Sequence, residues 1–372
     1  MSTPPPPSGA PGWLRVPGLP PWSLAGPVLA AAALGLSWAL PFNLGLALVL
    51  AAGLFLAVIS AVHHAEVIAH RVGEPYGTLV LAVAVTVIEV ALIVALMLAG
   101  GPSAHALARD TVFAAIMIVC NGVVGLCLVV GGLRHGVVAF RVDGTSPALA
   151  CLAALVGLAL VLPNFTTTTS GPTYSSSQLA FAGVASLALY GVFVFVQTVR
   201  HRDYFLPVGV NDEEVHAAPP PNWVAWCSLG LLMLALVGVV GLAKAFAPAL
   251  NAGVAAIGAP ESLSGVLIAL IVLLPETGAA LRAARGNRMQ SSLNLALGSG
   301  LASIGLTIPV VAAASLLFHF PLVLGLPPMQ MELLVLTMIV GTLTLGSGRA
   351  TVLQGAVHLV VFAAFLFLAV VP

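Results

Sequence analysis

Charge is what this sequence has least of. Only 12 basic and 12 acidic residues occur among 372, so charged residues make up 6% of the chain and the net charge is zero. A water-soluble domain needs more charge than this to cover its surface, which excludes a soluble protein. No basic excess is present to contact phosphates, so a nucleic-acid partner is not indicated. Hydrophobic residues fill 60% of the chain, and the lipid bilayer is the predicted surrounding.

Cysteine is also scarce, and the four present lie within or beside apolar runs without metal-ligand spacing. We interpret them as packing residues rather than as metal ligands or a disulfide framework. They are Cys120, Cys127, Cys151 and Cys227. The polar cluster HHAEVIAHRVGEP (63–75) places His64, Glu66 and His70 as H-x-E-x-x-x-H, which is not the H-E-x-x-H of zinc proteases. No cofactor is predicted. An intramembrane enzyme is not supported, because no nucleophile with a base and no metal motif stands at membrane depth.

Apolar runs fill the chain after a polar, proline-rich tail at residues 1–22, which we expect to be disordered. Eleven runs are long enough to cross a bilayer as helices, and the sequence therefore predicts an all-α membrane protein with eleven transmembrane helices. The runs cover about 23–41, 43–62, 77–99, 111–132, 147–163, 178–199, 223–246, 261–283, 291–318, 328–346 and 350–371.

Arginine placement supports this count. With a cytoplasmic N-terminus, alternation puts ten of the twelve basic residues on the cytoplasmic side and leaves only Arg109 and Lys244 outside. The C-terminus is then predicted to be periplasmic. The loop at 163–178 has no charge and falls outside, whereas the longer polar loop at 201–222 falls inside.

Eleven helices divide into one extra helix (23–42) and two repeats of five (43–199 and 223–372), separated by an acidic cytoplasmic loop (200–222) that contains Asp212, Glu213 and Glu214. A tandem repeat with an odd number of crossings must be inverted in the membrane. The sequence thus predicts two inverted five-helix repeats. In an unstructured loop the three acids are ordinarily solvated, and attraction of cations is the alternative.

Two glutamates occupy corresponding places in these repeats. Glu89 lies in the middle of the apolar stretch 77–97, and Glu276 lies in the second helix of the second repeat. Inverted repeats bring such residues together near the bilayer midplane, where they would bind a transported cation and proton. Pro275 predicts a helix break that frees backbone carbonyls beside Glu276. A buried, protonated structural glutamate is the alternative for each, and a cation channel is the alternative for the pair.

Three segments carry a resemblance to a known family: 65–93 (AEVIAHRVGEPYGTLVLAVAVTVIEVALI), 109–122 (RDTVFAAIMIVCNG) and 273–309, which begins LLPETGAALRAARGNRMQ. They resemble the calcium/cation antiporter superfamily, and specifically its bacterial ChaA-type calcium (sodium or potassium)/proton antiporters. The resemblance implies exchange of Ca²⁺, and also of Na⁺ or K⁺, for H⁺ across the bacterial inner membrane. A Na⁺(K⁺)/H⁺ antiporter with little Ca²⁺ transport is the alternative.

The resemblance also implies further site residues. By position, Asn121, Ser299 and Ser303 match polar groups that the family presents to the ion, and Glu66 matches the cytosolic approach. The Gly-Asn pair that precedes each glutamate in the wider family is replaced by Val85 and Thr86 in the first repeat and by Val272 and Leu273 in the second. Thr86 restores one oxygen ligand, and Leu273 restores none. We also predict that pH adjusts the cytosolic approach to the ion site through His63, His64 and His70. The alternative is that these histidines form an interfacial polar belt.

Overall fold

The computed structural model describes residues 19–73, 76–99, 105–206, 219–260 and 262–371. Most of the predicted tail (1–22) lies outside these ranges, and so do the acidic residues Asp212, Glu213 and Glu214 of the loop at 200–222. The chain forms two compact units, residues 1–81 with 216–242 (unit 1) and residues 82–215 with 243–372 (unit 2).

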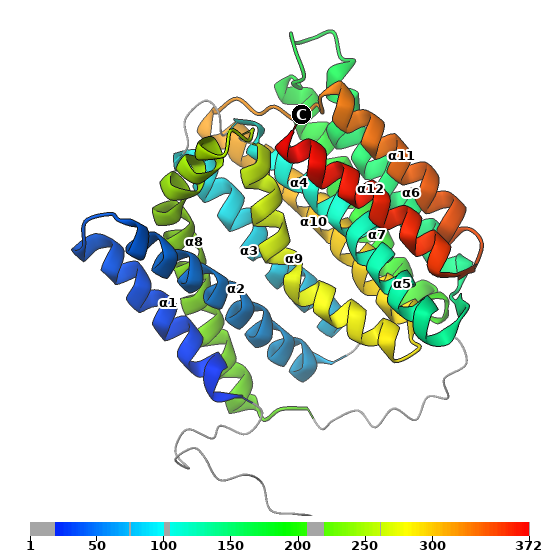
Figure 1. Cartoon of the computed structure of the whole chain (residues 1–372), viewed down its shortest axis with the longest axis horizontal. Coiled ribbons are helices and arrows are strands. Elements are labelled where there is room, and N and C mark those ends of the chain that lie inside the picture. The colour runs from blue at the N-terminus through cyan, green and yellow to red at the C-terminus, as the bar shows by residue number, and fades with distance from the viewer. Residues whose placement is uncertain (1–18, 74–75, 100–104, 207–218, 261, 372) are drawn as a thin grey trace, which may run out of the picture. The chain divides into compact units, whose positions relative to one another are not determined.

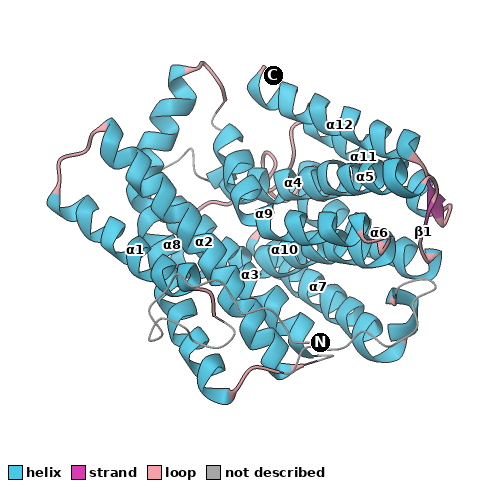
Figure 2. Cartoon of the chain, turned by 60° about the horizontal axis from the view of Figure 1, so that its bottom comes forward, coloured by secondary structure: helices cyan, strands magenta, loops and turns pink. Residues whose placement is uncertain are grey.

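Helices make up almost the whole of the described chain (Figures 1 and 2). Unit 1 holds α1 (Pro21–Ala39), α2 (Leu44–Val72), the start of α3 (Tyr76–Ala99) and most of α8 (Asn222–Ala256). Unit 2 holds the rest of α3 and α8, then α4 (Leu107–Met117), η3 (Ile118–Val123), α5 (Val124–His135), α6 (Val142–Val156), η4 (Gly157–Val161), η5 (Leu162–Asn164), α7 (Ser176–Phe195), η6 (Val196–Arg200), η7 (Arg202–Phe205), α9 (Ser262–Arg285), α10 (Met289–Phe318), α11 (Pro328–Leu345) and α12 (Val352–Val370).

The predicted number of crossings is confirmed within the described residues. Ten helical spans are long and apolar enough to cross a membrane, with α4, η3 and α5 forming one continuous span. The eleventh is α3, whose 24 residues match the run predicted at 77–99 and include the apolar helical stretch Val80–Val94.

One end of unit 2 gathers the arginine-rich connections, and we call it the basic end. There a two-residue strand β1 (Val138–Ala139) pairs antiparallel with β2 (Arg349–Ala350), as Figure 2 shows beside α5 and α6. The His135 ring lies 3.1 Å from the carbonyl oxygen of Arg285, and the backbone N–H of Arg141 donates to Gln290 at 2.6 Å. The loops that alternation placed on one side of the membrane therefore meet in space.

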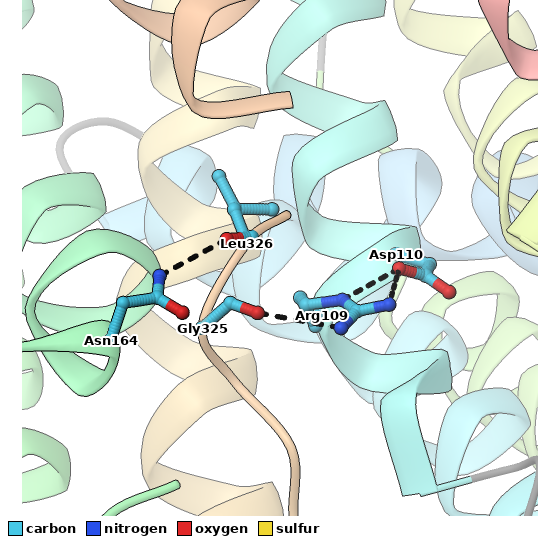
Figure 3. Close-up of polar contacts among 5 residues, drawn as sticks. All are labelled: Arg109, Asp110, Asn164, Gly325 and Leu326. Carbon is cyan, nitrogen blue, oxygen red and sulfur yellow. Dashed lines mark hydrogen bonds and ion pairs between the residues drawn. The ribbon is translucent and has the colours of Figure 1, made fainter. Parts of the chain in front are cut away.

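The opposite end of unit 2 is closed by an extended segment, residues 319–327. Its backbone N–H groups donate to carbonyls in three other parts of the chain: Val323 to His105, Gly325 to Pro172, and Leu326 to Leu160 in η4. Arg109 at the start of α4 pairs with Asp110 at 2.7 Å and donates to the carbonyl of Gly325 at 3.3 Å (Figure 3). Arg109 was predicted on the opposite side of the membrane from most arginines, and here its guanidinium group is bound by the Asp110 carboxylate and the Gly325 carbonyl.

These two ends give the direction of each helix. The span from α4 to α5 runs toward the basic end, α6 runs away from it, and α7 runs toward it. In the second repeat the corresponding helices run the opposite way: α10 runs away from the basic end, α11 toward it and α12 away from it. The predicted inversion of the repeats is therefore confirmed for these three helix pairs.

The predicted break at Pro275 is wrong. The α9 helix continues through this residue from Ser262 to Arg285. Proline removes one backbone donor, but a helix packed in a bundle tolerates the loss when its other hydrogen bonds and neighbouring helices hold it. Here α9 packs against α4, α5 and α10. The helix at Pro275 therefore lacks one backbone N–H donor but is not unwound.

Candidate functional site

Glu89 is a buried carboxyl group in the middle of α3. Only 5% of the residue is exposed, and Ile88 and Leu92 beside it are also buried. Ser303 of α10 donates its hydroxyl to Glu89 Oε1 at 2.5 Å. A carboxyl group in apolar surroundings needs such a partner, because an unpaired one would carry a large desolvation cost. The contact joins the second helix of one repeat to the third helix of the other. Ion binding by either residue stays a prediction.

Thr86 lies one helical turn before Glu89, so the two side chains share one face of α3. It is 5% exposed, and its hydroxyl donates to the carbonyl of Ala82 at 2.9 Å. The hydroxyl oxygen keeps its acceptor lone pairs after this donation. The same face therefore offers carboxylate and hydroxyl oxygens, which are the hard ligands that alkali and alkaline-earth cations prefer.

Glu276 lies on α9, immediately after Pro275, and is partly buried. Thr277 beside it donates its hydroxyl to the carbonyl of Leu273 at 2.7 Å, which reinforces the helix across the proline. Near its start α9 is held close to α4: a Cβ on Gly265 would lie 3.1 Å from the Cβ of Asp110. The meeting of Glu276 with Glu89 around one ion stays a prediction.

Asn121 lies in η3, a π-helical segment between α4 and α5, and is fully buried. Its amide nitrogen donates to Thr337 Oγ1 of α11 at 2.9 Å, and its amide oxygen lies 3.2 Å from His358 Nδ1 of α12. Its hydrogen bonds thus run to α11 and α12. Ser299, one turn before Ser303 on α10, is partly buried. Ion contact by either residue stays a prediction.

The polar cluster of α2 belongs to unit 1. His64 is buried, and its Nε2 lies 2.9 Å from the carbonyl oxygen of Ser23 on α1, while the His63 ring lies 4.9 Å from the ring of Trp22. These two histidines therefore contribute to packing between α1 and α2. Glu66 and His70 are exposed on the same helix. The predicted role of Glu66 in cytosolic access, and a pH effect through the histidines, stay predictions.

Sequence reasoning missed three residues that the structure joins to Asn121, two directly and Thr344 through His358. His358 is 1% exposed within the apolar α12, and Thr337 and Thr344 are buried on α11. The signal was present in VLQGAVHLVVFAAF, where one titratable side chain interrupts an apolar run as Glu89 does in α3. Threonines in an apolar helix carry no such signal, because each can satisfy its hydroxyl on its own backbone.

Comparisons with known proteins agree with this architecture. The family model described as sodium/calcium exchanger protein matches residues 42–199 and 227–371. The inferred ionic transporter y4hA of Sinorhizobium fredii is 50% identical, over 95% of this chain and 97% of that protein. The sodium-potassium/proton antiporter ChaA of Escherichia coli is 35% identical, over 92% and 94%.

Among solved structures, the H⁺/Ca²⁺ exchanger CAX superposes with a TM-score of 0.70 at 18% identity, over 93% of this chain and 87% of that one. This similarity extends the shared fold over nearly the whole chain. Together with the arrangement of helices and repeats, these matches show that the chain belongs to the sodium/calcium exchanger family.

Proposed function

We propose that the protein is a secondary antiporter that exchanges Na⁺, K⁺ or Ca²⁺ for H⁺ across the bacterial inner membrane. The observation that carries the proposal is the hydrogen bond from Ser303 to the buried Glu89. It joins helices of the two repeats, and transporters of inverted-repeat architecture hold their ions at the interface between repeats. The name of the ChaA relative, a sodium-potassium/proton antiporter, supports this class of reaction.

Exchange follows from competition for the same carboxyl oxygens. A buried carboxylate must be neutralised either by a proton or by a bound cation. In the proposed cycle a cation displaces protons from Glu89 and Glu276 on one side, the occupied site reorients by alternating access, and protons displace the cation on the other side. The carrier with two bare carboxylates does not reorient, because two uncompensated charges in the low-dielectric interior are too costly. This restriction couples the two fluxes.

Relaxed ion selectivity follows from the neutral ligands. Ca²⁺ takes six to eight oxygens, and two carboxylates balance its charge. Val85, Val272 and Leu273 offer no side-chain oxygen in place of the family's Gly-Asn pairs, and only Thr86 does. Na⁺ and K⁺ tolerate a poorer shell, with one carboxyl retaining its proton. We therefore expect Ca²⁺/H⁺ exchange of modest affinity together with Na⁺/H⁺ and K⁺/H⁺ exchange.

Everted membrane vesicles with an imposed pH gradient test this function. Addition of Na⁺, K⁺ or Ca²⁺ should each dissipate the gradient, and millimolar Na⁺ or K⁺ should slow Ca²⁺ uptake at alkaline pH. A channel would instead carry cations down their own gradient without moving protons. If Na⁺ and K⁺ neither move protons nor slow Ca²⁺ uptake, the selectivity argument is wrong. Cation flux without proton movement would contradict antiport itself.

Removing the hydroxyl that contacts Glu89 should weaken cation binding. In Ser303→Ala the carboxylate loses a hydrogen bond that is worth about 1.5 to 3 kcal/mol when the acceptor is charged. We expect the apparent cation KM to rise by roughly tenfold or more at each pH tested. Ser315→Ala is the matched control, because its hydroxyl donates to the carbonyl of Phe320 at the far end of α10. An unchanged KM in Ser303→Ala would contradict a role for this contact in ion binding.

A further inference from the structure

A row of buried polar side chains connects η3, α11 and α12 in unit 2. Its four members are Thr344, His358, Asn121 and Thr337, each no more than 4% exposed. Their contacts measure 3.1 Å from Thr344 Oγ1 to His358 Nε2, 3.2 Å from His358 Nδ1 to Asn121 Oδ1, and 2.9 Å from Asn121 Nδ2 to Thr337 Oγ1. Polar groups this deep in an apolar bundle are retained at a cost, which the hydrogen bonds offset.

The last bond of the row determines the direction of the others. Thr337 donates its single hydroxyl hydrogen to the carbonyl of Leu333 at 2.7 Å, so it must accept from the amide nitrogen of Asn121. The amide oxygen of Asn121 then faces His358. Because an amide oxygen only accepts, His358 Nδ1 carries a hydrogen. In the neutral ring Nε2 is the acceptor, and Thr344 donates to it.

Asn121, the residue to which His358 bonds, lies in the irregular segment η3. At the end of this π-helical segment the N–H of Val124 donates to the carbonyls of Val119 and Asn121. In a regular α-helix it would donate to the carbonyl of Cys120. The His358 ring is bonded to this segment through the side chain of Asn121. Segments of this kind inside α-helices occur frequently at functional sites.

The η3 segment also packs against the helix that carries Ser303. A Cβ on Gly300 of α10 would lie 3.4 Å from Val119 Cγ1 of η3, so the α10 backbone at Gly300 faces the Val119 side chain. Gly300 lies three residues before Ser303, whose hydroxyl donates to Glu89. The path from His358 thus runs through Asn121 and Val119 to α10 and the carboxyl group.

We propose that His358 is a positioning residue for the cation site, which acts through its Nδ1–H and Asn121 to hold η3 against α10. The inference rests on the proposed antiport, because the site that it positions is the one around Glu89. It assigns His358 a neutral, fixed tautomer and no part in carrying the exchanged proton. It also assigns Asn121 to the support of the site in place of direct ion contact.

Two substitutions of His358 separate its nitrogens. The side-chain nitrogen of Asn falls near the position of Nδ1, whereas the amide of Gln extends to the position of Nε2. His358→Asn therefore keeps the donor to Asn121, and His358→Gln loses it. We expect His358→Gln to raise the apparent cation KM by about 5- to 10-fold, the size of one net hydrogen bond. His358→Asn should stay within about 2-fold of wild type by the same scale.

A double substitution and a melting curve complete the experiment. Asn121→Ala should raise the KM as His358→Gln does, and the double variant should show no further increase, because both changes break one path. Each His358 variant loses one of the ring's contacts, so both should melt at similar temperatures. A merely structural role would then affect their KM values alike. The pH profile of exchange should be unchanged in His358→Asn.

Equal KM values for His358→Asn and His358→Gln would overturn the inference, as would additive effects with Asn121→Ala. Loss of proton coupling in both His358 variants would overturn it in favour of proton transfer by the ring. In each of these cases wild-type exchange remains and the proposed function stands. A wild-type protein that moves no protons with any of the three cations would overturn the proposed function and this inference together.

Discussion

Glu89→Gln and Glu276→Gln should each abolish cation/proton exchange, with initial rates reduced by at least about 100-fold, while the protein still folds and inserts. The amide is nearly isosteric with the carboxyl group, and at position 89 its oxygen still accepts the Ser303 hydroxyl, now 2.5 Å from Glu89 Oε1. It binds neither the exchanged proton nor a cation by charge, however, and loss of both is larger than loss of any single neutral contact. Exchange in proteoliposomes, with the inserted amount measured separately, checks this result.

Two further variants make the test specific. Glu332 lies exposed near the start of α11, so Glu332→Gln should exchange as wild type does. Glu89→Asp keeps the charge but moves it back by one methylene, and we expect it to retain part of the activity with a raised cation KM. Exchange near the wild-type rate in either glutamine variant would contradict the two-carboxylate mechanism. It would instead favour the alternative that this glutamate is a buried, protonated structural residue.

The fold could be predicted from the sequence because the bilayer imposes simple rules on it. Apolar runs of sufficient length gave the crossings, and the alternation of arginines matched the loops that meet at the basic end. The acidic residues followed from the same rules, since a lone charge in an apolar run has to be explained. Ser303, found through the family resemblance, does contact Glu89.

The rest could not be predicted because it depends on packing between helices distant in the sequence. Asn121 was recognised as polar and buried, but no pattern specifies that its partners are Thr337 and His358, more than two hundred residues away. Pro275 shows the opposite failure. The predicted break was wrong, because the packing of α9 between its neighbours outweighs the local tendency of proline to break a helix.

Gly355→Ala should destabilise the protein more than any other single-methyl change at the seam between α5 and α12, which lie side by side (Figure 1). A Cβ at this position would lie 2.7 Å from the backbone nitrogen of Val129 and 2.8 Å from the carbonyl oxygen of Gly125. Backbone atoms cannot rotate away as a side chain can, so the helices must separate. We expect the free energy of unfolding to fall by about 1 to 3 kcal/mol, as for other overpacked cores. Thermal melting in detergent measures it.

Gly191→Ala on α7 is the matched control, because no heavy atom lies within 4 Å of its Cβ position. There alanine should stabilise by up to about 1 kcal/mol, since glycine is the poorer helix former. The two changes are chemically identical and opposite in expected sign. Because separation of α12 from α5 would also pull the His358 ring from Asn121, Gly355→Ala should in addition raise the cation KM, as His358→Gln does. A melting temperature at or above that of wild type would show that α5 and α12 are not held as closely as their glycines indicate.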